Sequence, residues 1–238
     1  MTIPDQMAAV LLTGHGGLDK LDYREDVPVP QPAGGDVLIR IGAAAVNNTD
    51  INTRTGWYSR AVVEGTTADG GAGGFDTADA GDAGWSGAAL DFPCIQGADV
   101  CGTIVATGEG VDADRIGERV LVEPCLRGRN GSYYDNIRYF GSECDGGFAQ
   151  YAVAPAAHAH AVRSAMSDAE LASFPCSYST AENLLSRAGV SAGETVLITG
   201  ASGGVGSAAV QLAARRGADI FAVAGESKAA DVEAAGAG

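Results

Sequence analysis

Basic side chains are scarce in this chain. Its 238 residues include 15 Lys and Arg against 30 Asp and Glu, which gives a formal net charge of −15 at pH 7. Nucleic acid and anionic membrane surfaces repel so acidic a protein, and neither is expected as a partner. With 46% hydrophobic and 19% charged residues, the composition is that of a globular protein with one large domain or two modest ones.

Cysteines, histidines and long apolar runs are also few. The five cysteines show no C-x-x-C spacing and the start of the chain lacks a signal-peptide pattern, so a reducing cytoplasm is predicted. No apolar run approaches the length that spans a bilayer, so no membrane segment is predicted. Of the three histidines, the pair His158-x-His160 is interpreted as exposed strand decoration rather than a ligand pair.

The most informative stretch that is present joins an apolar run to a helix through glycines. Residues Thr195–Thr199 are β-branched and apolar like a buried strand, and 207–215 has apolar residues at helical spacing. Glycines in the turn let a pyrophosphate approach the backbone, and the helix start offers it unpaired N–H groups. A second strand is expected at 219–223, so the order of elements predicts a dinucleotide-binding unit. The residues expected to form its phosphate cradle are Gly200, Ser202, Gly203, Gly204, Val205 and Gly206.

The end of the second strand indicates which nicotinamide cofactor is preferred. An acidic residue there usually selects NAD, whereas this chain has Ala224. Ser227 and Lys228 follow closely, and a hydroxyl and an ammonium group suit the 2′-phosphate of NADP. NADP(H) is therefore predicted over NAD(H). Two alternatives stay open: Glu226 could turn inward to the ribose, and Lys228 could be a solvated lysine at a helix start.

Short strands and turns predominate before this unit. Runs at 8–13, 36–41, 92–105, 117–122 and 146–153 predict a β-rich domain. Residues 64–84 are Gly, Ala, Asp and Thr with almost no large apolar side chain, and they are expected to form a flexible, poorly ordered insertion. A polar cluster at 47–58 follows an apolar strand end, a position where loops tend to carry function.

Taken together, these features resemble the medium-chain dehydrogenase/reductase superfamily. The resemblance rests on the β-rich opening, the Gly-Glu-Arg-Val turn at 117–120, and Ala-Ser-Gly-Gly-Val-Gly after Val-Leu-Ile-Thr-Gly. It implies an α/β plus β fold: a GroES-like catalytic β-barrel at 1–155, a junction at 156–177 and a Rossmann cofactor domain at 178–238. A complete Rossmann domain needs about six strands. Only two are expected here, so the domain is expected to be partial and the sequence truncated at its C-terminus.

The same resemblance bears on zinc. In the family's zinc alcohol dehydrogenases, three ligand positions correspond to Asn47, Ala98 and Cys176 of this chain. One thiolate is too poor a set for a tetrahedral site that needs three protein ligands, so no catalytic zinc is expected. Cys176 is interpreted as a small buried residue rather than a nucleophile.

The chain is more similar to the zinc-independent quinone oxidoreductase branch, which has Asn at the first ligand position and a Tyr on the same loop. The match implies that Asn47 and Tyr58 donate hydrogen bonds to the substrate oxygen that gains charge. Asp50 is assigned to the catalytic site with them, and Thr180 matches the family's threonine near the nicotinamide. Alternatively, Asn47 caps a helix, Tyr58 packs against the insertion, and Asp50 forms an ion pair with Arg54.

The sequence therefore predicts an NADP(H)-dependent, zinc-independent oxidoreductase that transfers hydride to a quinone, enone or aldehyde-type carbonyl substrate. A zinc-type alcohol dehydrogenase with altered ligands and a catalytically silent fragment are the alternatives. By the family resemblance, a homo-oligomer, either dimer or tetramer, is also expected.

Overall fold

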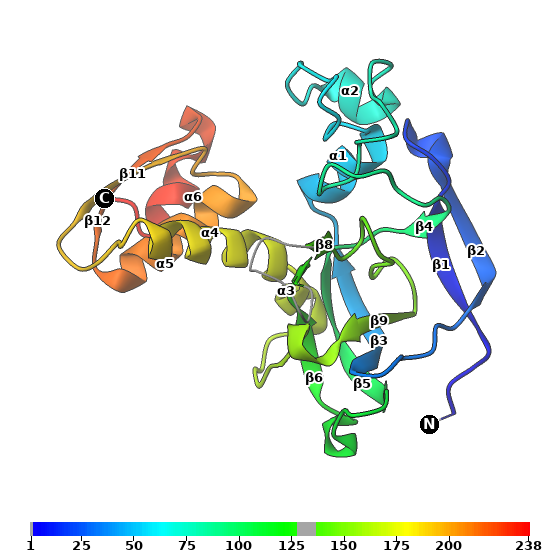
Figure 1. The fold of residues 1–238 in the computed structure, drawn as a ribbon. Helices are drawn as coiled ribbons and strands as arrows, with labels where there is room; N and C mark the ends of the chain where they lie inside the picture. Colours follow the sequence, from blue (N-terminus) through cyan, green and yellow to red (C-terminus); the bar gives the residue numbers. More distant parts are fainter. Residues whose placement is uncertain (1, 128–136) are drawn as a thin grey trace. The chain divides into compact units, whose positions relative to one another are not determined.

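The computed structural model describes residues 2–127 and 137–238 (Figure 1). The chain divides into two compact units, Met1–Pro175 and Cys176–Gly238, which we call the N-terminal and C-terminal units. The division falls two residues before the expected end of the junction at 177. Each helix in the described part of the chain is too short or too polar to cross a membrane.

The N-terminal unit is built on antiparallel strands. A five-stranded sheet has the order β10-β6-β5-β3-β9 and a three-stranded sheet the order β2-β1-β4, while β7 and β8 form a separate pair. The strands are β1 Gln6–Leu12, β2 Leu21–Pro28, β3 Asp36–Ala45, β4 Cys94–Ile95, β5 Asp99–Thr107, β6 Arg119–Val122, β7 Cys125–Leu126, β8 Arg138–Tyr139, β9 Tyr151–Pro155 and β10 Ala159–Ala161. This agrees with the β-rich domain that the sequence predicts.

Strand β3 organises the core of this unit, because its alternate side chains point to opposite faces. Val37 and Ile39 enter a buried cluster with Val100 of β5. Leu38 enters a second cluster with Met7 of β1. Strand β3 of the five-stranded sheet therefore contributes to both core clusters, and this packing positions its C-terminal end, where the polar cluster begins.

Short helices connect these strands. They are η1 Leu18–Lys20, α1 Asn48–Thr55, α2 Ala68–Gly73, η2 Ala113–Arg115, η3 Ala156–His158 and α3 Asp168–Ala172. Helix α1 follows β3 directly and ends at Gly56, which has a left-handed conformation (φ 76°) that glycine adopts without strain. Figure 1 shows α1 next to α2.

The insertion at 64–84 differs from the expectation that it lacks order. It contains α2, and the Arg54 guanidinium of α1 donates to the carbonyl oxygens of Gly16 (2.5 Å) and Gly71 (2.6 Å). The Phe75 N–H donates to Thr55 O, and the Asp79 N–H donates to the Ser59 hydroxyl. These long-range hydrogen bonds stabilise a segment that has almost no large apolar side chains of its own. Flexibility of the segment stays a prediction.

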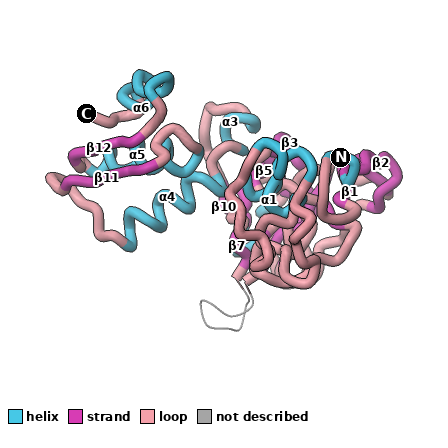
Figure 2. Tube along the Cα trace, turned by 90° about the horizontal axis from the view of Figure 1, so that it is seen from above, coloured by secondary structure: helices cyan, strands magenta, loops and turns pink. Residues whose placement is uncertain are grey.

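The C-terminal unit packs helices on one face of a short parallel sheet (Figure 2). Its elements are α4 Pro175–Arg187, β11 Thr195–Thr199, α5 Gly204–Arg216, β12 Asp219–Val223, η4 Glu226–Lys228 and α6 Ala229–Ala234. Strands β11 and β12 pair in parallel over their whole length, from Thr195 opposite Asp219 to Thr199 opposite Val223, which confirms the predicted pair.

Only one face of this sheet is covered in the described residues. Ile198 and Ile220 are buried in a cluster with Val210 of α5. On the opposite face, Leu197 and Phe221 are 67% and 62% exposed.

Candidate functional site

The start of α1 carries the first candidate residue, Asn47. Its backbone is extended (φ −121°, ψ 163°) and it occupies the N-cap position of α1, which agrees with the alternative that Asn47 caps a helix. Its side-chain Nδ2 donates to Oδ2 of Asp99 at 3.0 Å. Asp99 is 1% exposed and lies opposite Ala45 in the β3–β5 register. Strand pairing therefore brings the carboxylate to Asn47 across 52 residues of sequence.

Asp50, in the first turn of α1, is buried and bonded through both oxygens. Oδ2 accepts the Asn47 N–H at 2.8 Å, and Oδ1 accepts the N–H groups of Gly97 (3.1 Å) and Ala98 (3.2 Å). Burial raises the pKa of Asp50 from 3.8 to about 6, against the lowering effect of these three donors. The carboxylate thus ties α1 to the segment before β5.

The alternative in which Asp50 pairs with Arg54 is wrong. The Arg54 guanidinium donates instead to two backbone carbonyls, those of Gly16 and Gly71. Its role is to hold neighbouring loops to α1.

Tyr58 is half-buried, and its side chain contacts the first turn of α1. Its hydroxyl donates to Thr49 Oγ1 at 3.0 Å, and its ring meets Trp57 edge-on at 5.7 Å. Its neighbour Trp57 bonds to the start of the insertion, through its indole N–H and Glu64 O (3.1 Å). Asn47, Asp50 and Tyr58 therefore gather around the first turn of α1.

In the C-terminal unit, the glycine turn has the geometry of a phosphate cradle. Gly200 has φ 62°, and the Ala201 N–H donates to Val223 O of β12 at 3.0 Å. A Cβ on Gly206 would lie 2.1 Å from Gly200 O, and one on Gly204 would lie 2.7 Å from the buried Ser177 Oγ of α4. Only glycine fits at 206 without a backbone shift.

The open side of this turn exposes backbone donors. Ser202, Gly203 and Gly204 are exposed, while Val205 is half-buried against the core of the unit. The first N–H groups of an α-helix have no intrahelical acceptor, and α5 is thirteen residues long with its N-cap at Gly203. A pyrophosphate group therefore fits here.

The residues assigned to the 2′-phosphate lie at the same edge of the sheet. Because β11 and β12 run in parallel, their C-terminal ends meet at one edge, and the Ala201–Val223 bond joins the turns that follow them. Ser227 and Lys228 are exposed in η4, together with Glu226. Thr180 is exposed on α4, and its hydroxyl donates to Cys176 O at 2.7 Å.

The three positions that correspond to zinc ligands in the family do not suit zinc. The Asn47 amide donates to a carboxylate, and Ala98 is buried and offers no ligand atom. Residues 2–127 and 137–238 contain no group of three or more His, Cys, Asp or Glu arranged to hold a metal ion. Cys176 is half-buried on α4. Zinc independence nonetheless stays a prediction.

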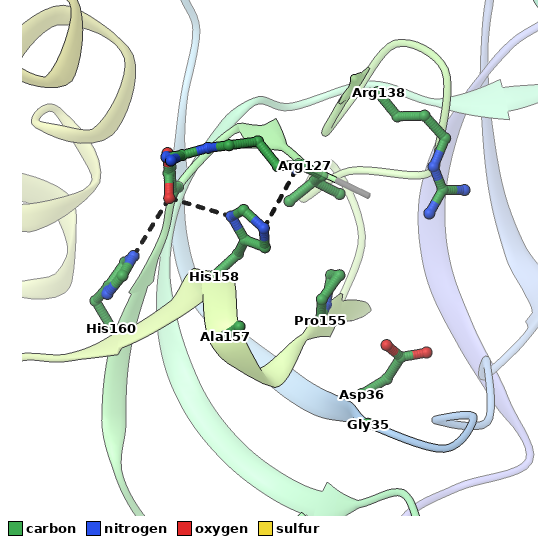
Figure 3. Close-up of a pocket in the computed structure, with 10 residues that line it drawn as sticks. Gly35, Asp36, Arg127, Arg138, Pro155, Ala157, His158 and His160 are labelled. Carbon is green, nitrogen blue, oxygen red and sulfur yellow. Dashed lines mark hydrogen bonds and ion pairs between the residues drawn. The ribbon is translucent and has the colours of Figure 1, made fainter. Parts of the chain in front are cut away.

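A separate hollow of about 770 Å³ lies on the N-terminal unit, and residues of β3, β7, β8, β9, η3 and β10 line it. Figure 3 shows the His158, His160 and Arg127 side chains converging on one point, the Glu123 carboxylate. His158 Nδ1 lies 3.1 Å from Glu123 Oε2, and His158 Nε2 accepts the Arg127 N–H at 3.3 Å. The hydrogen bond from His158 and the Arg127 charge lower the pKa of Glu123 to about 2. These groups satisfy one another, which favours a structural role.

This cluster corrects one interpretation from the sequence. His158 is buried at the end of η3 and is not exposed strand decoration, because Glu123 and Arg127 occupy both of its ring nitrogens. His160 is exposed on β10, as expected.

Asp99 is the site residue whose contact the sequence did not reveal. In the sequence it is only an acidic residue next to Ala98, one of the three positions that correspond to zinc ligands in the family. Its place at the start of a buried strand, after Gly97 and Ala98, was the available signal, because a buried carboxylate needs a donor.

Comparison with known proteins matches residues 33–164 to the family described as alcohol dehydrogenase GroES-like domain. The chain is 31% identical to human quinone oxidoreductase over 220 residues, which are 92% of this chain and 53% of that protein. It is 30% identical to acryloyl-coenzyme A reductase of Metallosphaera sedula over 227 residues, 91% of this chain and 58% of that protein.

A solved structure from Sinorhizobium meliloti 1021, described provisionally as an alcohol dehydrogenase, is 49% identical with a TM-score of 0.83. The match covers 99% of this chain and 62% of that one. These comparisons confirm the expected fold class, a GroES-like domain followed by part of a Rossmann domain. The chain spans only about half the length of the curated relatives it matches.

Proposed function

Because the chain belongs to the medium-chain dehydrogenase/reductase superfamily of alcohol dehydrogenase-like proteins, we propose that it acts as a nicotinamide-dependent oxidoreductase. In this proposal the reaction is zinc-independent, NADP(H) is the cofactor, and the substrate is a quinone, enone or aldehyde-type carbonyl compound. The observation that carries the proposal is the cradle at the start of α5, where a Cβ on Gly206 would meet Gly200 O at 2.1 Å.

The C-terminal unit would bind the cofactor through its backbone. The N–H groups of the first turn of α5 would donate to the pyrophosphate, which the positive end of the helix dipole also attracts. Ser227 and Lys228 would contact the 2′-phosphate by a hydroxyl and a charge. Thr180 would lie near the nicotinamide, as the family resemblance implies.

The N-terminal unit would bind the substrate oxygen. A bound reduced nicotinamide supplies the hydride. Asn47 Nδ2 has a second hydrogen to donate to the oxygen that gains negative charge, and such a fixed donor lowers the barrier without a metal. Tyr58 Oη would donate its single hydrogen to the same oxygen by exchanging roles with Thr49, whose hydroxyl then donates to Tyr58 Oη. Asp50 would act by holding the helix start at Asn47, next to Thr49, which Tyr58 contacts.

Zinc independence is supported by the same residues. A zinc site with Asn47 and Ala98 as two of its three positions would have neither a thiolate nor an imidazole there. The name of human quinone oxidoreductase supports a quinone as substrate, and the name of the Metallosphaera sedula enzyme supports an activated enone-type substrate. A homo-oligomer belongs to the proposal as well.

Binding, turnover and metal content test the proposal together. Fluorescence titration of the chain should show tighter binding of NADPH than of NADH, and NADPH should be oxidised with 1,4-benzoquinone or but-3-en-2-one as acceptor. Elemental analysis of dialysed protein should find no stoichiometric zinc. Failure to bind either cofactor would contradict the proposal, as would one zinc per chain that disappears in Cys176→Ala. Sedimentation measures the oligomeric state.

A further inference from the structure

The side chain and the backbone of Asn47 are both held by carboxylates. Its N–H donates to Asp50 Oδ2 at 2.8 Å and its side-chain Nδ2 donates to Asp99 Oδ2 at 3.0 Å. Asp99 is the first residue of β5 and lies in the interior, in register with the end of β3. The acceptor of the amide is therefore fixed to the centre of the five-stranded sheet.

A carboxylate determines the orientation of the amide that it contacts. An ionised carboxylate only accepts hydrogen bonds, so it selects the nitrogen of the Asn47 amide and rejects the oxygen. Nδ2 carries two hydrogens, and the bond to Asp99 uses one of them. The direction of the second hydrogen is then fixed by the planar geometry of the amide.

Charge and position act in opposite directions here. A buried negative charge behind the donor repels an oxyanion that forms in front of it, and this electrostatic effect would slow the reaction. A donor held in place gains because it needs no reorganisation when the charge develops. The two effects are separable, because an amide in place of the carboxylate keeps an acceptor oxygen and removes the charge.

We propose that Asp99 is a positioning residue: it orients the Asn47 amide so that the second Nδ2 hydrogen is presented to the substrate oxygen. This inference rests on the proposed function of Asn47 as a donor. Asp99 itself touches neither substrate nor cofactor in this proposal.

The test compares Asp99→Ala, which removes the acceptor, with Asp99→Asn, which keeps one. The control is Asp145→Ala, because Asp145 is another carboxylate of this unit that accepts a hydrogen bond, from the Ile95 N–H at 2.8 Å, and it lies outside the proposed site. Each protein is assayed for kcat and KM with NADPH and 1,4-benzoquinone, for NADPH affinity, and by NMR of the ¹⁵N-labelled side-chain amide of Asn47.

In Asp99→Ala, kcat should fall about ten- to a hundredfold, the range expected when a catalytic group is displaced by up to 1 Å. NADPH affinity should be unchanged, and the Asn47 amide signals should move toward those of a solvated amide. Asp99→Asn should recover most of kcat, and Asp145→Ala should leave both kcat and the Asn47 signals as in the wild type.

Several outcomes would overturn the inference. One is a kcat for Asp99→Ala equal to that of the wild type, and another is a loss in Asp99→Asn as large as in Asp99→Ala. If Asp99→Ala does not fold, Asp99→Leu, which fills the buried space without an acceptor, replaces it in a cycle with Asn47→Ala and the double variant, and additive effects on kcat then contradict the inference. A wild type that binds NADPH but reduces no acceptor contradicts the proposed function, and the positioning role fails with it.

Discussion

The start of α1 and the start of α5 present hydrogen-bond donors by two different physical means. At α1 the donors are side chains that other buried side chains hold: Asp99 of β5 holds Asn47, and Thr49 of α1 holds Tyr58. At α5 the donors are backbone N–H groups, and the glycine turn with the two strands beside it determines their position. The first site should therefore respond to pH and to distant substitutions, and the second to added volume.

The largest effect is expected from Asp50→Ala. This change leaves three N–H groups without their acceptor, part-buried at Asn47 and buried at Gly97 and Ala98, at about 1–3 kcal/mol for each buried group before relaxation. The free energy of unfolding should fall by about 3–5 kcal/mol in urea titrations of the chain. Asp91→Ala, at an exposed carboxylate, is the control and should change it by less than about 0.5 kcal/mol. Equal stability of the two variants would show that Asp50 is dispensable to the helix start.

The second largest effect is expected in the pH dependence of stability, which should differ between the two sites. Because the pKa of Asp50 is raised from 3.8 to about 6, its contribution to stability is complete below pH 3.8 and is lost as the pH rises through about 6. The loss is up to about 3 kcal/mol. Hydrogen-exchange protection of the Gly97 and Ala98 amides should therefore be lower at pH 7 than at pH 4, while that of Ser207 in α5 should not follow this change.

Asp50→Asn is the control for this prediction, because its side chain does not titrate. The pH dependence of Gly97 and Ala98 protection should disappear in that variant. The explanation fails if the dependence persists.

A smaller effect on stability is expected from Gly206→Ala in the cradle. The new Cβ would lie 2.1 Å from Gly200 O, and the backbone shift that relieves this overlap should cost about 1–3 kcal/mol. NADPH binding should weaken at least about tenfold, because the shift moves the donors of the first helical turn. Gly203→Ala, whose Cβ would lie 3.4 Å from the same oxygen, is the matched control and should bind nearly as well as the wild type. Equal losses in both variants would mean that added volume at this turn is not what matters.

The smallest effect on stability should come from Lys228→Ala, which removes one exposed charge. A charge-assisted contact with the 2′-phosphate is worth roughly 1.5–3 kcal/mol, so NADPH should bind about ten- to a hundredfold more weakly while NADH is unaffected. Arg215→Ala removes an exposed charge from the last turn of α5 and serves as the control. Equal loss for both cofactors, or tighter NADH binding by the wild type, would show that Lys228 does not contact the 2′-phosphate.

The distance along the chain over which each site is built explains how far the sequence could predict it. The cradle depends on residues 200–206 and on the two strands beside them, so its elements and the parallel pairing followed from local patterns. The Asn47–Asp99 bond joins residues 52 positions apart, and the His158–Glu123 bond joins residues 35 apart. Strand register decides such contacts, and single-sequence patterns do not contain it.

The insertion is a second case of the same limit. Composition alone predicts that 64–84 cannot repay the entropy of ordering. Its contacts come from elsewhere, because Arg54 and Ser59 bond to its backbone and Ala83 is fully buried. The alternative that paired Arg54 with Asp50 shows the same limit, since the two are close in sequence but the Arg54 guanidinium donates to Gly16 O and Gly71 O instead.

The exposed face of the β11–β12 sheet determines how this chain behaves in concentrated solution. Leu197 and Phe221 offer an adhesive apolar surface, and the formal charge of −15 opposes contact between molecules. Added salt reduces that opposition, since the screening length shrinks from about 10 Å at 0.1 M to about 3 Å at 1 M. The net interaction between molecules should therefore change from repulsive to attractive as ionic strength rises, and contact through this apolar face should be weakest in dilute buffer.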